Sequence, residues 1–328
     1  MRIVFPGQTG LWWMLLVAGC TQAPLNYEIP PDVSPPCTAP SCVPVVIASQ
    51  QNRPYTLALD GTSLYWTNSA ADGAIMKIAL AGGVPAVLAP HEHSPGPIVV
   101  DSSRVYWTSL TDGEVRSVEL SGGVANVIAS GQSNPLCVQV DAAFVYWTRQ
   151  RGITGGDVMR LPIHGGLATA LAGDQDLPLD LILNGDSLFW ISSNLNMDAG
   201  YLNKIPILGA DLPTGLSSFA PAPVALVADA TSVYFTDGSP GTVTKIGRDG
   251  GASLTLATAY QHANDIAIDD THVYWTSQDG GAVLKVSKSG GKAAILAIGQ
   301  GRPFGIAVDA TSVYWANVDS GMVMKVGK

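Results

Sequence analysis

An aromatic pair followed by a small or polar residue recurs along this chain at nearly constant spacing. The second aromatic residues of successive copies lie 41, 40, 43, 45, 40 and 40 residues apart. A fixed period of this length indicates a repeat architecture in which each copy forms one supersecondary unit. The copies are Tyr65-Trp66-Thr67, Tyr106-Trp107-Thr108, Tyr146-Trp147-Thr148, Phe189-Trp190-Ile191, Tyr234-Phe235-Thr236, Tyr274-Trp275-Thr276 and Tyr314-Trp315-Ala316.

Each aromatic pair lies within a set of strand-length segments that end at turn residues. In the last copy an apolar stretch at 306–309 precedes the aromatic strand at 312–315, and a third stretch follows at 322–326. In other copies a Gly-Gly pair then leads to a fourth apolar stretch, such as 294–297. Four short antiparallel strands per about 40 residues are typical of one propeller blade. The sequence therefore predicts an all-β fold, a seven-bladed β-propeller.

The missing fourth strand of the last copy is expected at the other end of the chain. The seventh copy reaches Lys328 without a fourth strand, whereas residues 43–49 form an unassigned apolar stretch before Arg53-Pro54-Tyr55. Residues 293–297 precede Arg302-Pro303-Phe304 in the same way. We expect the N-terminal strand to complete the last blade and close the ring, which removes exposed sheet edges. One propeller domain then spans residues 43–328.

The N-terminal segment is typical of a protein that is exported and lipidated. Residues 3–27 carry no charge, and the apolar run 11–18 is too short to span a bilayer. Val17-Ala18-Gly19-Cys20 resembles the bacterial lipobox, which implies a signal peptide at 1–19 and lipidation of Cys20. Residues 20–42 are rich in proline and predict an extended tether. An ordinary signal peptide that contains a cysteine is the alternative.

The lipobox resemblance also implies a location. A lipidated Cys20 would make the protein extracytoplasmic and lipid-anchored, and its contact with the membrane would be through the anchor alone. Thr21, rather than Asp, follows the cysteine. By resemblance to enterobacterial lipoproteins this favours the outer membrane of a Gram-negative bacterium.

The aromatic motifs resemble those of the YWTD propellers of low-density lipoprotein receptors, and more loosely those of NHL-type and streptogramin-lyase-type propellers. Two departures limit what the resemblance implies. YWTD domains have six blades, whereas this chain has seven copies, and the motif aspartate is retained only as Asp237. The resemblance therefore implies the fold and a general binding role, and it names no ligand.

Three cysteines remain after the predicted cleavage and lipidation. Cys37 and Cys42 can form a disulfide in an oxidising compartment, although their spacing is not that of a zinc site. Cys137 lies in an apolar strand pattern, which predicts a buried and unreactive thiol.

Two polar series recur once in each copy. An acidic or amide residue ends the first strand, and we interpret it as a turn cap rather than as a calcium ligand, because Thr or Ser often follows two positions later. A basic residue recurs on the third strand, and we expect its stem to pack between blades. The first series is Asp60, Asp101, Asp141, Asn184, Asp229, Asp269 and Asp309; the second is Lys77, Arg116, Arg160, Lys204, Lys245, Lys285 and Lys325.

Residues outside the repeat are the better candidates for function. We expect the loops that lead into each first strand, and those between the second and third strands, to share one face of the propeller, here called the loop face. Binding residues concentrate on such loops. The candidates for a ligand-binding role on this face are His91, Glu92, His93, Arg149, Arg151, Asp176, His262 and Asp265.

The histidines among these candidates raise the hypothesis of a metal or acid–base site. Streptogramin-type lyases use a histidine and a metal on this face, by resemblance. However, His91 and His93 enter one blade and His262 enters another four blades on. We therefore predict no metal site, no cofactor and no catalytic residue from the sequence.

The charge of the chain and its motifs restrict the function further. The formal net charge of −9 disfavours nucleic-acid binding, and neither a G-x-S-x-G motif nor a P-loop is present. We predict a binding or scaffold module for a protein or cell-envelope polymer. The alternatives are a lyase or lactonase-like enzyme acting on a small molecule at the mouth of the central channel, and a purely structural role. An apolar loop-face patch would favour the binder, and a pocket with perturbed acids or bases would favour the enzyme.

Overall fold

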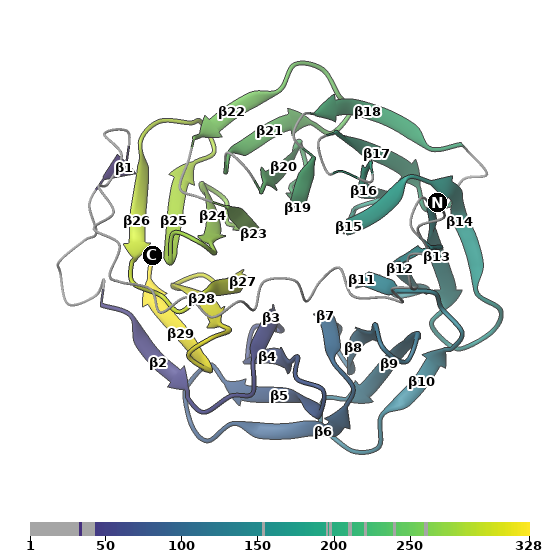
Figure 1. Ribbon diagram of the computed structural model, residues 1–328, viewed down its shortest axis with the longest axis horizontal. Coiled ribbons are helices and arrows are strands. Elements are labelled where there is room, and N and C mark those ends of the chain that lie inside the picture. Colours follow the sequence, from purple (N-terminus) through teal and green to yellow (C-terminus); the bar gives the residue numbers. More distant parts are fainter. Residues whose placement is uncertain are drawn as a thin grey trace, which may run out of the picture.

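The computed structural model describes residues 33–34, 43–152, 155–194, 196, 199–208, 212–219, 222–238, 241–258 and 262–328. These residues form seven sheets arranged around a central axis (Figure 1), which confirms the predicted all-β, seven-bladed propeller. Six sheets have four strands and one has five. Nowhere in these ranges is there a helix long and apolar enough to cross a membrane. Cys20, Cys37, Cys42 and the predicted signal peptide lie outside the described residues.

The four strands of each blade follow one another from the axis to the periphery. The innermost strands are β3 (Pro54–Leu59), β7 (Pro95–Val100), β11 (Pro135–Val140), β15 (Leu177–Asn184), β19 (Pro223–Ala228), β23 (Ala263–Ile268) and β27 (Pro303–Val308). The second strands are β4 (Ser63–Asn68), β8 (Arg104–Ser109), β12 (Phe144–Gln150), β16 (Ser187–Ser193), β20 (Ser232–Asp237), β24 (His272–Ser277) and β28 (Ser312–Asn317).

The outer half of each blade is built in the same way. The third strands are β5 (Gly73–Ala79), β9 (Glu114–Glu119), β13 (Gly156–Pro162), β17 (Gly200–Pro206), β21 (Val243–Gly247), β25 (Ala282–Ser287) and β29 (Met322–Gly327). The outermost strands are β6 (Ala86–Glu92), β10 (Asn126–Ala129), β14 (Thr169–Gln175), β18 (Thr214–Phe219), β22 (Leu254–Ala257), β26 (Ala293–Ala297) and β2 (Val45–Ala48). Blades are numbered 1 to 7 from β3 to β27.

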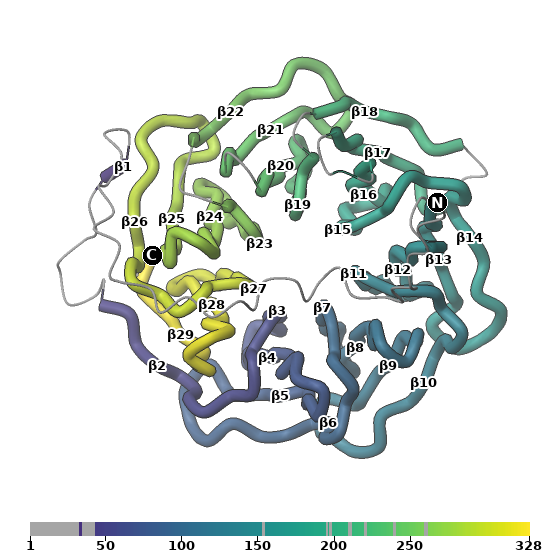
Figure 2. The backbone as a smooth tube through the Cα atoms, viewed as in Figure 1, coloured from purple at the N-terminus to yellow at the C-terminus, as the bar shows by residue number. Residues whose placement is uncertain are grey.

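The ring is closed by the N-terminal strand, as predicted. Strand β2 pairs antiparallel with β29, with Val46 opposite Met324, so the last blade contains both ends of the repeat region. The trace in Figure 2 returns to its starting point at blades 7 and 1. The inner strands β27 and β3 approach so closely there that a Cβ on Gly305 would lie 2.5 Å from the carbonyl oxygen of Tyr55. Glycine at this position therefore permits the closure.

A short strand, β1 (Val33–Ser34), adds a fifth strand to blade 6. It pairs in parallel with the start of β26, with Val33 opposite Ala293. The Val33 side chain is buried in the hydrophobic cluster between blades 5 and 6. This part of the predicted tether is therefore attached to the propeller, which the sequence analysis did not foresee.

The aromatic pair of each second strand packs on both sides of its blade. In blade 7, Trp315 and Val313 pack toward blade 6, whereas Tyr314 packs with Leu64 and Trp66 of blade 1. Both rings are almost fully excluded from solvent. Because every blade is covered on both faces by neighbouring blades, the strand is apolar at successive positions instead of alternating.

The polar groups of the repeat find partners within the ring. The carboxylate of Asp60 accepts hydrogen bonds from the backbone nitrogens of Thr62 and Ser63 and from the Tyr65 hydroxyl at 2.6 Å. Burial opposes ionisation of this carboxylate, but the hydrogen bonds outweigh it and lower the pKa of Asp60 to about 2. The same contacts occur at Asp101, Asp141, Asp229, Asp269 and Asp309. The interpretation as turn caps is confirmed.

Blade 4 departs from this arrangement in two positions together. Asn184 replaces the aspartate, and Phe189 replaces the tyrosine that would donate to it. The Asn184 amide instead donates to the carbonyl oxygen of Ala228 in the next blade. Loss of the hydroxyl donor therefore coincides with loss of its carboxylate acceptor.

The basic residues of the third strand bridge neighbouring blades. Lys77 lies over the Tyr65 ring and donates to the carbonyl oxygen of Leu120 in the next blade. Arg160 and Lys245 make the equivalent bonds to Ile207 and Lys288. This agrees with the structural role predicted for the series.

The prediction was wrong for one member of that basic series. Residue Ser117, not Arg116, occupies the repeat position in blade 2, because Tyr106 pairs with Ser117 and Trp107 pairs with Arg116. The basic series shifted by one position here, since a one-residue change of register moves a side chain to the other face of a strand. Arg116 therefore has a different environment, described below.

Candidate functional site

The two sets of loops predicted to share a face do so. The backbone nitrogen of Ser69, between β4 and β5, donates to the carbonyl oxygen of Arg53, which precedes β3. Gln132 donates to Gly113 in the same way at the next blades. The Gly-Gly turns and the turns between first and second strands form the opposite face, here called the turn face; there Leu80 donates to Thr62.

Left-handed backbone conformations concentrate on the loop face. All non-glycine residues with positive φ in the described part of the chain lie in the loops that precede the inner strands: Gln50, Arg53, His91, Ser94, Asn134, Asp174, His262 and Arg302. The positions recur from blade to blade, and Gly131 and Gly299 occupy the position of His91. The conformation is thus set by the repeat, and the side chain carried there varies.

Exposed ion pairs connect neighbouring loops on this face. His91 lies 3.0 Å from Asp72, His93 lies 3.1 Å from Asp112, and His262 lies 2.6 Å from Asp279. In blade 7 the same role falls to Arg302, which lies 3.1 Å from Asp319. The three histidines are each more than half exposed. Each cation therefore pairs with an aspartate that the sequence analysis did not single out.

The pair of arginines at blade 3 forms a larger network. Arg149 and Arg151 both contact the buried carboxylate of Asp157, at 2.8 and 3.1 Å. Arg151 also contacts the exposed Asp174, and these two side-chain contacts raise the pKa of Arg151. Asp176 is exposed beside this network. Blade 3 therefore presents alternating charges, held by one buried carboxylate.

Glu92 does not lie on the exposed surface with the other candidates. It ends strand β6, its side chain is 3% exposed, and it accepts a hydrogen bond from the Trp107 indole at 3.1 Å. Arg116 lies 3.0 Å from the same carboxylate oxygen. Burial raises the pKa of Glu92, and the Arg116 charge opposes that shift. The pair occupies the place that Gln51 and Met76 take in blade 1.

Two further carboxylates lie on the innermost strands. Asp180 and Asp265 occupy the same repeat position, in β15 and β23. Each is half-buried and accepts a hydrogen bond from the next inner strand, from the backbone nitrogens of Leu226 and Ile306, both at 2.9 Å. Asp265 was predicted on a loop, but it lies in the wall around the axis. Asp180 was not predicted at all.

Burial dominates the protonation of these two groups. It raises the pKa of Asp180 to about 6 and that of Asp265 to about 7, although backbone hydrogen bonds oppose both shifts. The charge of Asp180 further raises the pKa of Asp265. Burial and then the charge of Asp265 raise the pKa of Tyr55, whose ring stacks on Phe304 with centroids 4.1 Å apart. The groups around the axis are therefore electrostatically coupled.

Cys137 occupies the same repeat position in β11 and is buried, as predicted. Its Sγ atom lies 3.4 Å from the carbonyl oxygen of Leu181 in the next blade. Burial and the neighbouring Asp180 hold the pKa of the thiol well above its usual range. A thiol in this state is protonated at neutral pH and is a poor nucleophile.

The axial carboxylates predict that stability falls with rising pH. Their pKa values are raised above the unfolded value of about 3.9, so the stabilisation is complete below about pH 4 and is lost as pH rises through 6 and 7. We expect the free energy of unfolding to fall by about 3 kcal/mol between pH 5 and 8, after allowance for solvent screening. Urea denaturation at several pH values measures this change.

The control for this experiment is the double variant Asp180→Asn, Asp265→Asn. It keeps every histidine that titrates in the same range, so the difference between variant and wild type isolates the axial pair. A pH dependence between 5 and 8 that is identical in both proteins would refute the assignment.

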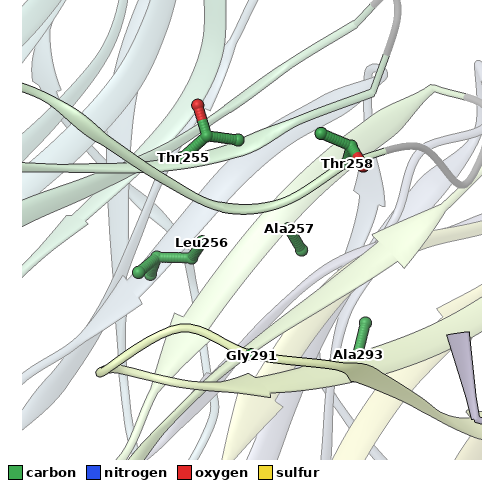
Figure 3. A pocket seen from close by; sticks show the side chains of 6 residues that line it. All are labelled: Thr255, Leu256, Ala257, Thr258, Gly291 and Ala293. Carbon is green, nitrogen blue, oxygen red and sulfur yellow. The ribbon is translucent and has the colours of Figure 1, made fainter. Parts of the chain in front are cut away.

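The described residues contain no cluster of three or more His, Cys, Asp or Glu side chains arranged to hold a metal ion. His91 and His93 lie between blades 1 and 2, whereas His262 precedes blade 6, so the structure does not bring them together. The two cavities of note are peripheral. One, of about 240 Å³, lies between the outer strands of blades 5 and 6 and is lined by residues such as Leu256, Thr258 and Ala293 (Figure 3).

Large exposed apolar side chains do not gather on the loop face, contrary to what a binding face was expected to have. Most of them lie on the turn face and the outer strands, such as Val84, Val124 and Leu167, each more than 85% exposed. The loop face is instead mainly polar. Any partner that it binds is therefore recognised through charge and hydrogen bonding.

The fold and these two faces define the protein as a seven-bladed β-propeller with a charged loop face. No protein-family model matches the chain, and no curated protein sequence matches it. Its fold is similar to that of virginiamycin B lyase from Staphylococcus aureus, with a TM-score of 0.73, 15% identity, and coverage of 87% of this chain and 98% of the other. A catalytically inactive variant of that lyase, with quinupristin, gives a TM-score of 0.72.

Two further structures share the fold. A chain of the nidogen–laminin complex has a TM-score of 0.54 and 20% identity, over 64% of this chain and 81% of the other. Puromycin hydrolase has a TM-score of 0.66 and 12% identity, over 86% of this chain and 54% of the other. Identities this low establish the shared propeller fold alone, and the fold serves both binding proteins and enzymes.

Proposed function

We propose that this protein is a lipid-anchored, extracytoplasmic binding module, which recognises a protein or cell-envelope polymer through its loop face. The observation that supports the proposal is the division of labour among polar groups. Aspartates, tyrosines and basic residues fixed by the repeat bond within the ring. The exposed charged groups that vary between blades lie on the loops.

The charges on the loop face favour a polar partner. Histidine or arginine pairs with aspartate at blades 1, 2, 3, 6 and 7, so cations and anions alternate around the ring. Exposed ion pairs contribute little to stability, which leaves these groups available for exchange with a partner's charges. Binding through such pairs is expected to weaken as salt concentration rises.

Photo-crosslinking in cells tests this proposal. A benzophenone amino acid replaces His93, Arg151 or His262 on the loop face, and Asp270 or Lys292 on the turn face as the matched control. We expect a discrete crosslinked species from the loop-face positions alone. Equal crosslinking from both faces, or none from the loop face, would refute it. Cys20→Ala tests the anchor separately, because this variant should leave the membrane fraction.

One observation favours a second candidate, an enzyme of the lyase or lactonase kind acting on a small molecule near the axis. The pKa values of Asp180 and Asp265 lie near neutrality, as a general acid or base requires. Quinupristin, found with the structurally similar lyase, is a suitable probe. Turnover of quinupristin that Asp265→Asn abolishes would favour the enzyme.

A further inference from the structure

The turn face carries an arc of exposed apolar side chains at one repeat position. Each residue lies at the start of the segment that leads into an outermost strand, in blades 7, 1, 2, 3 and 4 in order around the ring. Their exposed fractions range from 59% to 91%. We call this set the rim arc: Val43, Val84, Val124, Leu167 and Leu212.

The repeat does not require an apolar residue at this position. Blade 5 has Ala252 there and blade 6 has Lys292, after the same Gly-Gly turns. The rim arc is also extended by half-exposed valines on the adjoining outer strands, such as Val45, Val87 and Val127. An exposed apolar set of this extent on a folded domain indicates a surface that another phase or molecule covers.

The chain that leads to Cys20 leaves the propeller on this same face. Strand β1 is parallel to β26, which starts at the turn face, so the N-terminal end of β1 also points toward the turn face. Only 13 residues separate Cys20 from Val33. They can span at most about 45 Å. A lipid on Cys20 would therefore hold the turn face, and not the loop face, near the bilayer.

We propose that the rim arc inserts into the interfacial region of the bilayer that holds the anchor, and that the loop face points away from the membrane. This inference rests on the proposed lipid anchor. Insertion of valine and leucine side chains into the headgroup boundary is favourable because it removes their apolar surface from water. The attachment thereby fixes the orientation of the propeller as well as its location.

The charges on the turn face select the kind of lipid surface. Turn carboxylates such as Asp60, Asp101 and Asp309 lie on this face, nearer the axis than the rim arc. They would repel an anionic membrane. The surface that fits is therefore zwitterionic, and the contact should depend little on salt.

Depth-dependent quenching on the lipidated full chain tests the inference. An environment-sensitive fluorophore is placed at Val124→Cys on the rim arc or at Thr111→Cys, an exposed loop-face position of the same blade. Both proteins carry Cys37→Ser and Cys42→Ser, and Cys137 stays buried. In phosphatidylcholine vesicles with nitroxide-labelled lipids, we expect roughly threefold or greater quenching at Val124 relative to Thr111.

The outcomes separate the two proposals. A chain that does not co-float with vesicles refutes the lipid anchor. A chain that co-floats but shows equal quenching at both positions refutes the rim-arc contact alone. A blue shift of the Val124 label before vesicles are added would assign the rim arc to self-association and overturn the proposal. Val84→Asp with Leu167→Asp should reduce the quenching, whereas Ala252→Asp, at the same repeat position, should not.

Discussion

Deletion of residues 43–50 is expected to lower the melting temperature of the whole protein by about 10 °C. The deletion removes β2 and so exposes the edge of β29, whose Val323 and Val326 are fully buried. It also removes Ile47 and Ala48 from the cluster that contains Trp66. The lost hydrogen bonds and apolar burial together amount to about 4 kcal/mol.

The melting curve should remain a single transition, because opening one blade removes the support of both neighbours. Differential scanning calorimetry measures the shift, and circular dichroism checks that one transition is retained. Deletion of eight tether residues, 23–30, is the control of equal length. If the two deletions gave the same melting temperature, β2 would contribute nothing to the closed ring.

Arg116→Met is expected to destabilise the protein by about 3 kcal/mol, which is large for a single substitution. It removes the partner of Glu92 and leaves a carboxylate that is 3% exposed without a countercharge. Because Glu92 already has a raised pKa, protonation relieves part of this loss, so the effect should be smaller at pH 5 than at pH 8. Chemical denaturation at the two pH values measures it.

A double-mutant cycle provides the control. Blades 1, 3 and 7 carry glutamine and methionine where blade 2 carries Glu92 and Arg116; their glutamines accept the indole hydrogen bonds of Trp66, Trp147 and Trp315. Glu92→Gln combined with Arg116→Met therefore restores the usual pair. We expect the double variant to regain most of the lost stability. Additive losses would show that the two side chains act independently.

The fold was predictable because every blade repeats the same packing problem. The aromatic pair needs two apolar surfaces, and its period of about 40 residues is visible even where the individual residues change. The closing strand was predictable for the same reason, since 43–48 match the outer strand of another copy. The register of Arg116 was not, because a basic residue at either of two adjacent positions satisfies the pattern while only the strand pairing distinguishes them.

The candidate site was predictable as a face and not as a set of contacts. The loops converge because the strand order demands it, but the aspartates that pair with His91, His93 and His262 lie 17 to 19 residues away in sequence. Nothing local marks them. Asp180 and Asp265 did leave a signal, an acid two residues after the start of an apolar inner strand, and that departure from apolar composition could have been read as an axial position.

The pairing of β2 with β29 also governs when this protein can complete its structure. Val46 and Met324 are 278 residues apart along the chain, so their contact forms only after nearly all intervening sequence is available. Until then β2 has an unpaired edge and the first and last blades lack a neighbour, states that favour aggregation. Synthesis and export therefore proceed with an open ring, and the last strand acts as a checkpoint for completeness: a chain interrupted before β29 has no means of satisfying β2.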